Sequence, residues 1–284
     1  MEKYDLHSHS TASDGSLTPS QLVTRAHEKG VTALALTDHD TTNGLEEAQR
    51  TAQNLGLRLI PGIELSASWQ KHCLHIVGLG IDPTNPVLQA GIEKQQQLRS
   101  QRALKISEKL EKKRIFGAFE AVAQKAGSGM ITRLHYADFL VENQHVESQQ
   151  QAFDKYLGQG KSAFVSTTWA SLEETIHWIT ESGGIAVLAH PLRYKLTTSK
   201  LKKALTAFKQ AGGKGIEVVT GRSSPDDIHR SLHFARLFEL SASQGSDFHN
   251  PANEWVELGR LADMPTGIQP VWEMENIQGL TIYP

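Results

Sequence analysis

The sequence predicts an α/β domain in which parallel strands form a barrel-like sheet, interrupted by a helical insertion. Three observations support this prediction. Short apolar runs rich in β-branched residues alternate with amphipathic segments. Capping residues and glycines mark the ends of those segments, and the stretch 87–165 departs from the alternation. Periodicity does not separate a closed barrel from an open sheet, so at this level both geometries fit.

The overall composition is that of a globular protein. The 284 residues are 39% hydrophobic and 21% charged, a size that allows one large domain or one domain with an insertion. No apolar run reaches the roughly 18 residues that span a bilayer, and the amino terminus lacks the apolar stretch of a secretory signal. The formal charge of −2 argues against a protein that coats nucleic acid by bulk attraction. The single cysteine, Cys73, favours a cytoplasmic location and is interpreted as a small buried hydrophobic residue.

The first part of the chain contains four predicted strands and two predicted helices. Thr18 and Pro19 have the character of the N-cap and first residue of a helix that ends at Gly30. A second helix, closed by glycine, is expected over 43–56. The predicted strands span 4–7, 31–37, 57–65 and 73–79.

After the insertion the alternation resumes. Ser171 and Glu174 form a capping-box pair that opens a helix ending at Gly183 and Gly184. Further helices are expected over 199–213 and 224–239, and strands over 185–190, over 215–220 and within 240–249. The residues from 251 to 284 are expected to close the domain. The prediction is therefore seven strands in one discontinuous barrel, formed by 1–86 and 166–284.

The insertion 87–165 is expected to form a helical lid that is basic, whereas the rest of the chain is acidic. Residues 89–165 contain 12 Lys and Arg and 8 Asp and Glu, a net charge of +4, which leaves 17 against 23, or −6, for the remainder. The run 94–114 alone has eight basic residues, with Glu108 and Glu111 as its acids. Such a run either guides an RNA backbone or forms the solvated face of a helix.

Histidines and carboxylates follow the ends of the predicted strands. In parallel α/β folds these ends meet on one face, where active sites form. Six histidines and three carboxylates on one face are too many for a single ion, so the pattern predicts several metal ions. The candidate ligands are His7, His9, Asp14, His39, Glu64, His75, His190, Asp247 and His249.

Several neighbouring residues have less specific interpretations. Asp38 and Asp40 flank His39 and are either acceptors that fix its ring or simple loop acids. The remaining histidines fall on helices or loop edges and are expected to be solvated or to cap helices. They are His27, His72, His145, His177, His229 and His233.

The segments YDLHSHSTASDG, LTDHDT, PGIELSA, LAHP and GSDFH together resemble the polymerase-and-histidinol-phosphatase (PHP) family of metal-dependent phosphoesterases. The resemblance covers about residues 1–86 and 166–260. Within the insertion, ITRLHYADFLV and YLGQGKSAFV resemble the subgroup that contains ribonuclease AM and the 3',5'-nucleoside bisphosphate phosphatases. This resemblance implies a distorted (β/α)7 barrel with a trinuclear metal centre.

Carried over by position, the resemblance implies three sets of ligands. The first set is His7, His9, Glu64 and Asp247; the second is Glu64, His75 and His190; the third is Asp14, His39 and His249. His135 could compete with His190 for the second metal. Four further side chains can donate to phosphate and are either substrate contacts or solvated surface charges: Arg133, His135, Lys161 and Arg193. The resemblance to the subgroup favours substrate contact, less so for Arg193.

The donor set itself favours phosphate chemistry. Three divalent ions and three carboxylates leave a residual charge near +3, which suits a phosphate ester better than a neutral amide. Mixed nitrogen and oxygen ligation without thiolate fits manganese, iron or catalytic zinc, with manganese as the first choice. Our mechanistic hypothesis is attack on phosphorus by a metal-bridging hydroxide, with no protein nucleophile.

The predicted function is hydrolysis of nucleotide phosphate esters. The substrates would be the 5' ends of short RNA, as for a 5'–3' exoribonuclease, or 3',5'-bisphosphonucleotides. A small-metabolite phosphatase of the histidinol-phosphate type and a metal-dependent amidohydrolase are the alternatives. A polymerase-associated module would need segments for which 284 residues leave no room. No membrane association and no obligate protein partner are expected.

Overall fold

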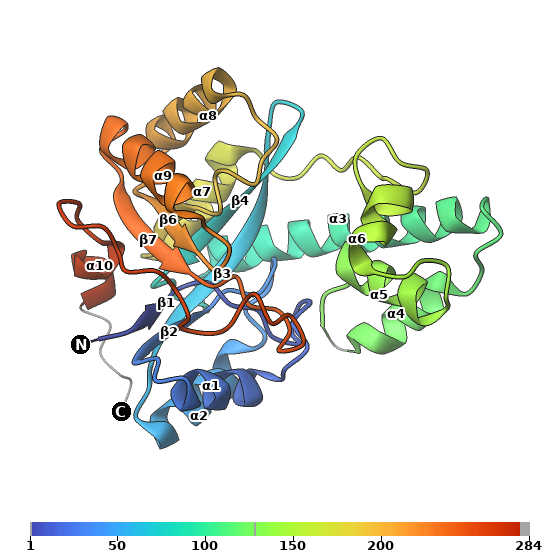
Figure 1. The fold of residues 1–284 in the computed structure, drawn as a ribbon, viewed down its shortest axis with the longest axis horizontal. Helices are drawn as coiled ribbons and strands as arrows, with labels where there is room; N and C mark the ends of the chain where they lie inside the picture. The colour runs from blue at the N-terminus through green and yellow to red at the C-terminus, as the bar shows by residue number, and fades with distance from the viewer. Residues whose placement is uncertain (1, 128, 279–284) are drawn as a thin grey trace.

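The computed structural model describes residues 2–127 and 129–278 and shows a barrel with a helical lobe beside it (Figure 1). Residue 128 of the predicted insertion and residues 279–284 of the predicted barrel lie outside the described residues. The strands are β1 (Tyr4–Asp5), β2 (Ala33–Leu36), β3 (Arg58–Trp69), β4 (His72–Leu79), β5 (Ile185–Leu188), β6 (Gly215–Thr220) and β7 (Ser241–Gly245). They form one sheet in sequence order, in agreement with the predicted barrel-like α/β fold.

The sheet is not entirely parallel, which corrects one expectation. β4 pairs antiparallel with both β3 and β5, while the other neighbouring pairs are parallel. The reason is the short connection at residues 70–71, because a parallel crossover needs a dozen or more residues. β3 also continues to Trp69, which pairs with His72, so these two strands form a long hairpin.

The last strand closes onto the first. His9 N donates to Phe248 O over 2.9 Å, and Leu6 N donates to Gln244 O over 3.0 Å. Gly245 permits this approach, because a Cβ there would lie 2.3 Å from the Cβ of His7. The two ends of the chain therefore contribute to the same end of the barrel.

The helices around the barrel begin and end where their capping residues indicate. They are α1 (Pro19–Glu28), α2 (Leu45–Leu55), α7 (Leu172–Glu181), α8 (Thr198–Gln210) and α9 (Pro225–Leu237). Thr18 and Ser171 complete capping boxes, and Gly56 ends α2 in the left-handed conformation at φ +68°. A 3₁₀ turn (Val271–Glu273) and α10 (Glu275–Gln278) follow the barrel.

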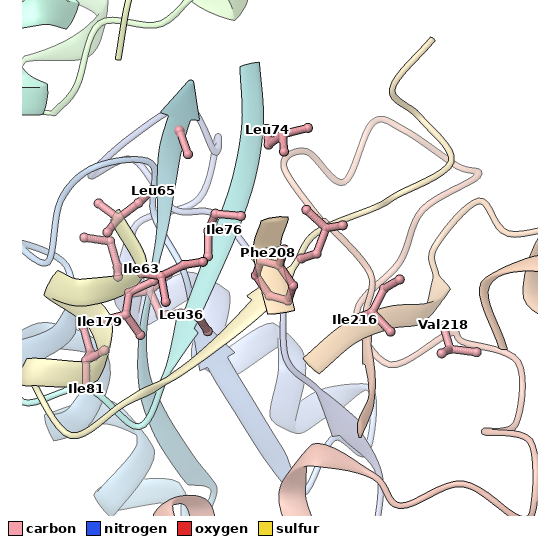
Figure 2. Packing of buried hydrophobic residues seen from close by; sticks show 14 of the residues in the cluster. Leu36, Ile63, Leu65, Leu74, Ile76, Ile81, Ile179, Phe208, Ile216 and Val218 are labelled. Carbon is pink, nitrogen blue, oxygen red and sulfur yellow. The ribbon is translucent and has the colours of Figure 1, made fainter. Parts of the chain in front are cut away.

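Alternate strand residues separate two apolar clusters. In β2, Leu34 and Leu36 pack toward the surrounding helices, whereas Ala33 and Ala35 belong to the smaller cluster inside the barrel. Figure 2 shows side chains of the larger cluster between the strands and their covering helices. This packing fixes the strands, and with them the loops at their ends.

The lobe beside the barrel has an apolar cluster of its own. It contains α3 (Pro86–Glu111), α4 (Ala118–Ala126), α5 (Arg133–Glu142), α6 (Gln149–Ala152) and a π-helical turn (Phe153–Leu157). The first part of α3 packs on the barrel, where Gly91 faces Trp178 of α7 so closely that a Cβ would lie 2.3 Å from the indole. Its second part contributes Ile106 and Leu110 to the lobe cluster.

Within the described ranges, none of the helices has both the length and the apolar character that crossing a membrane requires.

Candidate metal centre

The nine side chains singled out in the sequence lie together at one end of the barrel. His7, His9, His39, His190, Asp247 and His249 follow strand ends, Asp14 lies in the loop after β1, Glu64 lies within β3, and His75 lies within β4. Because β4 runs in the opposite direction, His75 comes early in its strand, opposite Ser66. Residues from 7 to 249 thus meet in one place, which we call the cage.

Glu64 lies at the centre of the cage. Its carboxylate is buried and has five imidazoles around it. Its Oε2 lies 3.3 Å from His7 Nε2, 3.4 Å from His9 Nε2 and 2.9 Å from His39 Nδ1, and its Oε1 lies 3.0 Å from His75 Nδ1 and 3.2 Å from His190 Nε2. One carboxylate therefore touches most of the cage.

The other two carboxylates lie at the sides of the cage. Asp247 Oδ1 is 3.3 Å from His9 Nε2, and Asp14 Oδ1 is 3.3 Å from His249 Nε2. The backbones of Asp247 and His190 both have positive φ, +55° and +28°, a region that residues other than glycine seldom occupy. Backbone strain of this kind persists where the surroundings hold it, and it clusters at functional sites.

The donors form three groups whose ligand atoms lie within 4.8 Å of one another. The groups are His9, Asp14, His39 and His249; His7, His9 and Glu64; and His39, Glu64 and His75. They resemble the three expected ligand sets, with His9 added to the third set and His39 added to the second. Asp247 and His190 are in none of the three groups. Asp247 lies beside His9, and the ring of His190 lies 3.2 Å from Glu64 Oε1. His135 is in none of these groups; its Nδ1 accepts a hydrogen bond from Thr132 N over 3.1 Å in the capping box of α5.

Several of these buried atoms lack hydrogen-bond partners among the described residues. They include His9 Nδ1 and His39 Nδ1, and also Glu64 Oε2, which lies 2.9 Å from His39 Nδ1 without hydrogen-bond alignment. The Nε2 atoms of His7 and His9 face each other at 3.1 Å. Buried polar atoms without partners are rare, and converging nitrogen and oxygen donors suit divalent cations. The cage therefore fits metal ions.

Electrostatics within the cage keeps its acids ionised. Burial opposes ionisation of Glu64, but His39, His7 and His75 outweigh it and hold the pKa of Glu64 well below its usual value. The pKa values of Asp14 and Asp247 are lowered in the same way. Conversely, burial would lower the pKa of His75, but the neighbouring carboxylate of Glu64 raises it to about 10. The carboxylate of Asp14 likewise raises the pKa of His249 to about 9.

Glu217 is a member of this site that the sequence analysis missed. Its Oε1 accepts from His7 Nδ1 over 2.6 Å, and its Oε2 accepts from His190 N over 2.6 Å. A register shift in β6 lies between Glu217 and Val219, and such bulges often redirect a side chain near an active site. The signal was available, because Glu217 is a lone acid in the apolar strand run GIEVVT.

Asp38 and Asp40 hold the loops of the cage. Asp38 accepts from Ser10 N over 2.8 Å and from Ser13 Oγ over 2.6 Å. Asp40 accepts from Ser66 N over 2.8 Å and from Arg99 Nε over 2.6 Å. In the described parts of the chain neither accepts from the ring of His39, so the role of fixing that ring is wrong and both are buried loop acids.

A cavity of about 400 Å³ opens beside the cage; we call it the arginine cavity. His39, His75, Asp14, Asp247 and His249 line one side. Five arginines line it as well: Arg99, Arg102, Arg133, Arg193 and Arg222. Two of them, Arg99 and Arg102, come from the basic run 94–114, while Lys94, Lys105, Lys112, Lys113 and Arg114 are exposed. The exposed residues form the solvated face of α3, as one interpretation of the run expects, and Arg99 and Arg102 face the arginine cavity.

Three of these arginines lack a carboxylate partner among the described residues: Arg102, Arg133 and the exposed Arg222. Arg102 is 9% exposed and lies over the ring of Trp169 at 4.8 Å, and burial together with Arg99 and Arg133 lowers its pKa to about 9. Arg133 lies over Phe153 at 5.9 Å. Buried cations without an anion are costly, so the cavity is suited to an anionic ligand.

The structure places the other predicted substrate residues differently. Arg193 lines the arginine cavity and forms an ion pair with Asp247. Lys161 is exposed and is not among the residues that line this cavity, and His135 lines a neighbouring cavity.

Cys73 corrects a further expectation. It is exposed and lines the arginine cavity instead of packing in the core. Alternate residues of a strand share a face, so Cys73 lies on the same side as His75, while Leu74 and Ile76 point into the apolar cluster.

Known proteins of similar sequence and structure point to one family. A model of the PHP domain matches residues 5–221. A 5'–3' exoribonuclease of Haemophilus influenzae is 46% identical over 96% of this chain and 98% of that protein, and a 3',5'-nucleoside bisphosphate phosphatase of Chromobacterium violaceum is 42% identical over 96% of each. A solved structure described as an amidohydrolase from Chromobacterium violaceum, with bound sulfate and no metal, is 42% identical with a TM-score of 0.92, covering 98% of this chain and 96% of that one.

Proposed function

The chain belongs to the PHP domain family, and from that premise we propose that it is a metal-dependent hydrolase of nucleotide phosphate esters. Its substrates would be short RNA, degraded from the 5' end, and 3',5'-nucleoside bisphosphates. The observation that carries this proposal is a cage of six histidines and three carboxylates that opens into a cavity lined by five arginines. Two relatives that match 96% of the chain are an exoribonuclease and a bisphosphate phosphatase, which supports both substrates.

The cage would hold three divalent ions, with manganese as the first choice and iron or zinc as alternatives. The proposed ligands are His7, His9, Asp14, His39, Glu64, His75, His190, Asp247 and His249. Bound metal would supply an activated water and neutralise charge on the phosphoryl group. Glu217 would orient His7 by accepting from its Nδ1, which directs Nε2 into the cage.

The arginine cavity would position the substrate. Arg102 and Arg133 would bind phosphate oxygens, and Arg193 would do so next to Asp247. His135 and Lys161 remain predicted contacts. One cavity serves both substrates because a 3',5'-bisphosphate resembles the terminal unit of a 5'-phosphorylated strand. The arginines argue against a neutral amide as the substrate.

The proposed domain organisation follows the separation between the apolar clusters of the barrel and that of the lobe. Residues 1–86 and 166–284 would form the barrel, and residues 87–165 would form a lid that carries Arg99, Arg102 and Arg133. The lone cysteine supports a cytoplasmic location.

The direct test compares substrates. Manganese-loaded protein is incubated with a 5'-phosphorylated oligoribonucleotide, the matching oligodeoxyribonucleotide, adenosine 3',5'-bisphosphate and histidinol phosphate, and phosphate or nucleotide release is measured. We expect the ribonucleotide and the bisphosphate to be preferred. A tenfold preference for histidinol phosphate would contradict the proposal, and unchanged release after chelation would exclude a metal-dependent reaction.

Binding of divalent metal is expected to release protons. At pH 8 the metal-free protein keeps His75 and His249 protonated, because their pKa values are raised to about 10 and about 9, whereas metal ligation needs neutral imidazole. Titration with manganese chloride in weak buffer should therefore acidify the solution, and affinity should rise with pH by about tenfold per pH unit for each displaced proton. Replacing an exposed histidine, as in His177→Ala, should leave the release unchanged. Metal binding without proton release would contradict the protonation assigned to the cage.

Arg133→Ala is expected to weaken substrate binding and leave the metal content unchanged. Loss of a charge-assisted hydrogen bond of about 1.5–3 kcal/mol corresponds to an increase in KM of about 10- to 150-fold. Steady-state kinetics on adenosine 3',5'-bisphosphate and elemental analysis measure the two properties. Arg230→Ala, on the exposed face of α9, is the matched control. Metal loss in Arg133→Ala would show that the arginine supports the cage instead.

A further inference from the structure

A second cavity, of about 850 Å³, adjoins the arginine cavity; we call it the distal cavity. Asp14 and His249 of the cage line both cavities, and so does Arg222. α5 and α6 of the lobe form one wall through Leu134 and Gln149, and the loop after β7 forms the other. The distal cavity is therefore a continuation of the proposed active site, between lobe and barrel.

The lining of the distal cavity differs from that of the arginine cavity. Hydroxyl and amide side chains predominate, namely Ser16, Ser148, Gln149, Gln150, Asn250 and Asn253. Its lysine, Lys125, is already paired with Asp138 at 3.3 Å and with Glu142 at 2.5 Å. Neutral donors and acceptors suit nucleobases and ribose hydroxyls, while the anionic phosphate lies at the arginine end.

Trp255 lines the distal cavity and is 81% exposed. The other tryptophans are either buried, as Trp69, Trp169 and Trp178 are, or stacked, as Trp272 is on Tyr4 with ring centroids 4.4 Å apart. An exposed indole beside a polar cavity is a surface on which a base can stack, and this stacking tolerates any base.

We propose that the distal cavity binds the nucleotides that follow the 5'-terminal one in a short single-stranded RNA, and that Trp255 stacks on one of their bases. This inference rests on the proposed function. The arginine cavity, at about 400 Å³, already has the size of a small-ligand site, so a mononucleotide bisphosphate does not need the additional volume. The distal cavity therefore separates the two proposed substrates: RNA contacts Trp255 and the bisphosphate does not.

The test measures kcat/KM on 5'-phosphorylated oligoribonucleotides of two to six residues and on adenosine 3',5'-bisphosphate. In the wild type we expect kcat/KM to rise with length beyond the dinucleotide. In Trp255→Ala that rise should disappear, so that the ratio of kcat/KM on the hexamer to that on the bisphosphate falls about tenfold or more. Trp255→Phe should restore most of the ratio.

Two further measurements guard against a structural explanation. Phe116→Ala removes an exposed aromatic side chain of the lobe, 70% exposed and outside both cavities, and should leave the ratio unchanged. Binding of a 5'-phosphorylated hexaribonucleotide to the chelator-treated protein should quench tryptophan fluorescence, and Trp255→Phe should lose that quenching while still binding the oligomer.

The outcomes distinguish this inference from the proposed function. If the wild type hydrolyses neither RNA nor bisphosphate, the proposed function fails. If the wild type hydrolyses RNA and bisphosphate, and Trp255→Ala either slows the two reactions equally or slows neither of them, the assignment of the distal cavity is overturned. Quenching that persists in Trp255→Phe overturns the stacking contact as well.

Discussion

Glu64→Gln should reduce phosphate release by at least about a thousandfold and remove metal from the purified protein. The neutral amide cannot replace a carboxylate whose two oxygens contact five imidazoles at 2.9–3.4 Å. Metal ions stabilise a phosphoryl-transfer transition state by several kcal/mol, and each 1.36 kcal/mol corresponds to a tenfold change in rate. Phosphate release from adenosine 3',5'-bisphosphate and elemental analysis measure the two effects.

Glu257→Gln is the matched control for this substitution. Glu257 is 16% exposed, pairs with Arg25 of α1 at 2.6 Å and lines neither of the two cavities. Its replacement should cost about 1 kcal/mol of stability at most and leave metal content and activity intact. Wild-type metal content in Glu64→Gln would show that the cage does not depend on its central carboxylate.

Arg99→Leu should lower the free energy of unfolding by about 3–5 kcal/mol. Arg99 Nε donates to Asp40 Oδ2 over 2.6 Å, and its second guanidinium nitrogen donates to Ser66 Oγ over 3.1 Å. All three side chains are buried, so removal of the cation leaves the charge of Asp40 without its partner. This pair joins α3 to the loop that holds His39. Urea unfolding followed by circular dichroism measures the change.

Lys94→Ala provides the comparison on the same helix. Lys94 forms an exposed ion pair with Glu174 at 2.8 Å, and such pairs contribute about 1 kcal/mol or less. In Arg99→Leu/Asp40→Asn, part of the lost stability should return, because the charge left uncompensated is removed. An Arg99→Leu protein that unfolds at the wild-type urea concentration would show that the buried pair does not hold α3 to the barrel.

Much of the fold was predictable because its signals are local. Thr18 and Ser171 begin their helices through capping hydrogen bonds, and Gly56 ends one through its left-handed backbone; each signal involves only a few adjacent residues. The gathering of the nine cage residues was predictable for a different reason: parallel strands bring their carboxyl ends to one face whatever lies between them. Their assignment to individual ions depends on distances that no spacing contains.

The other features depend on contacts between distant segments. The direction of β4 follows from the two-residue connection at 70–71. The predicted strand ended at residue 65, so the sequence did not show that β3 continues to Trp69 and leaves so short a connection. The arginine cavity takes its side chains from α3, α5 and the loops after β5 and β6, so its assembly depends on how the lobe sits on the barrel. The helical pattern of α3 does not reveal that Arg99 and Arg102 face inward while Lys105 faces solvent.

The closure of β7 onto β1 also determines when the cage can assemble during biosynthesis. His7 and His9 precede Asp247 and His249 by more than two hundred residues, so the early donors are synthesised long before the late ones. A nascent chain that ends before β7 has neither of the two late donors nor the strand that holds the early ones in place. The order of donors along the chain therefore means that the cage is complete only after translation has passed His249.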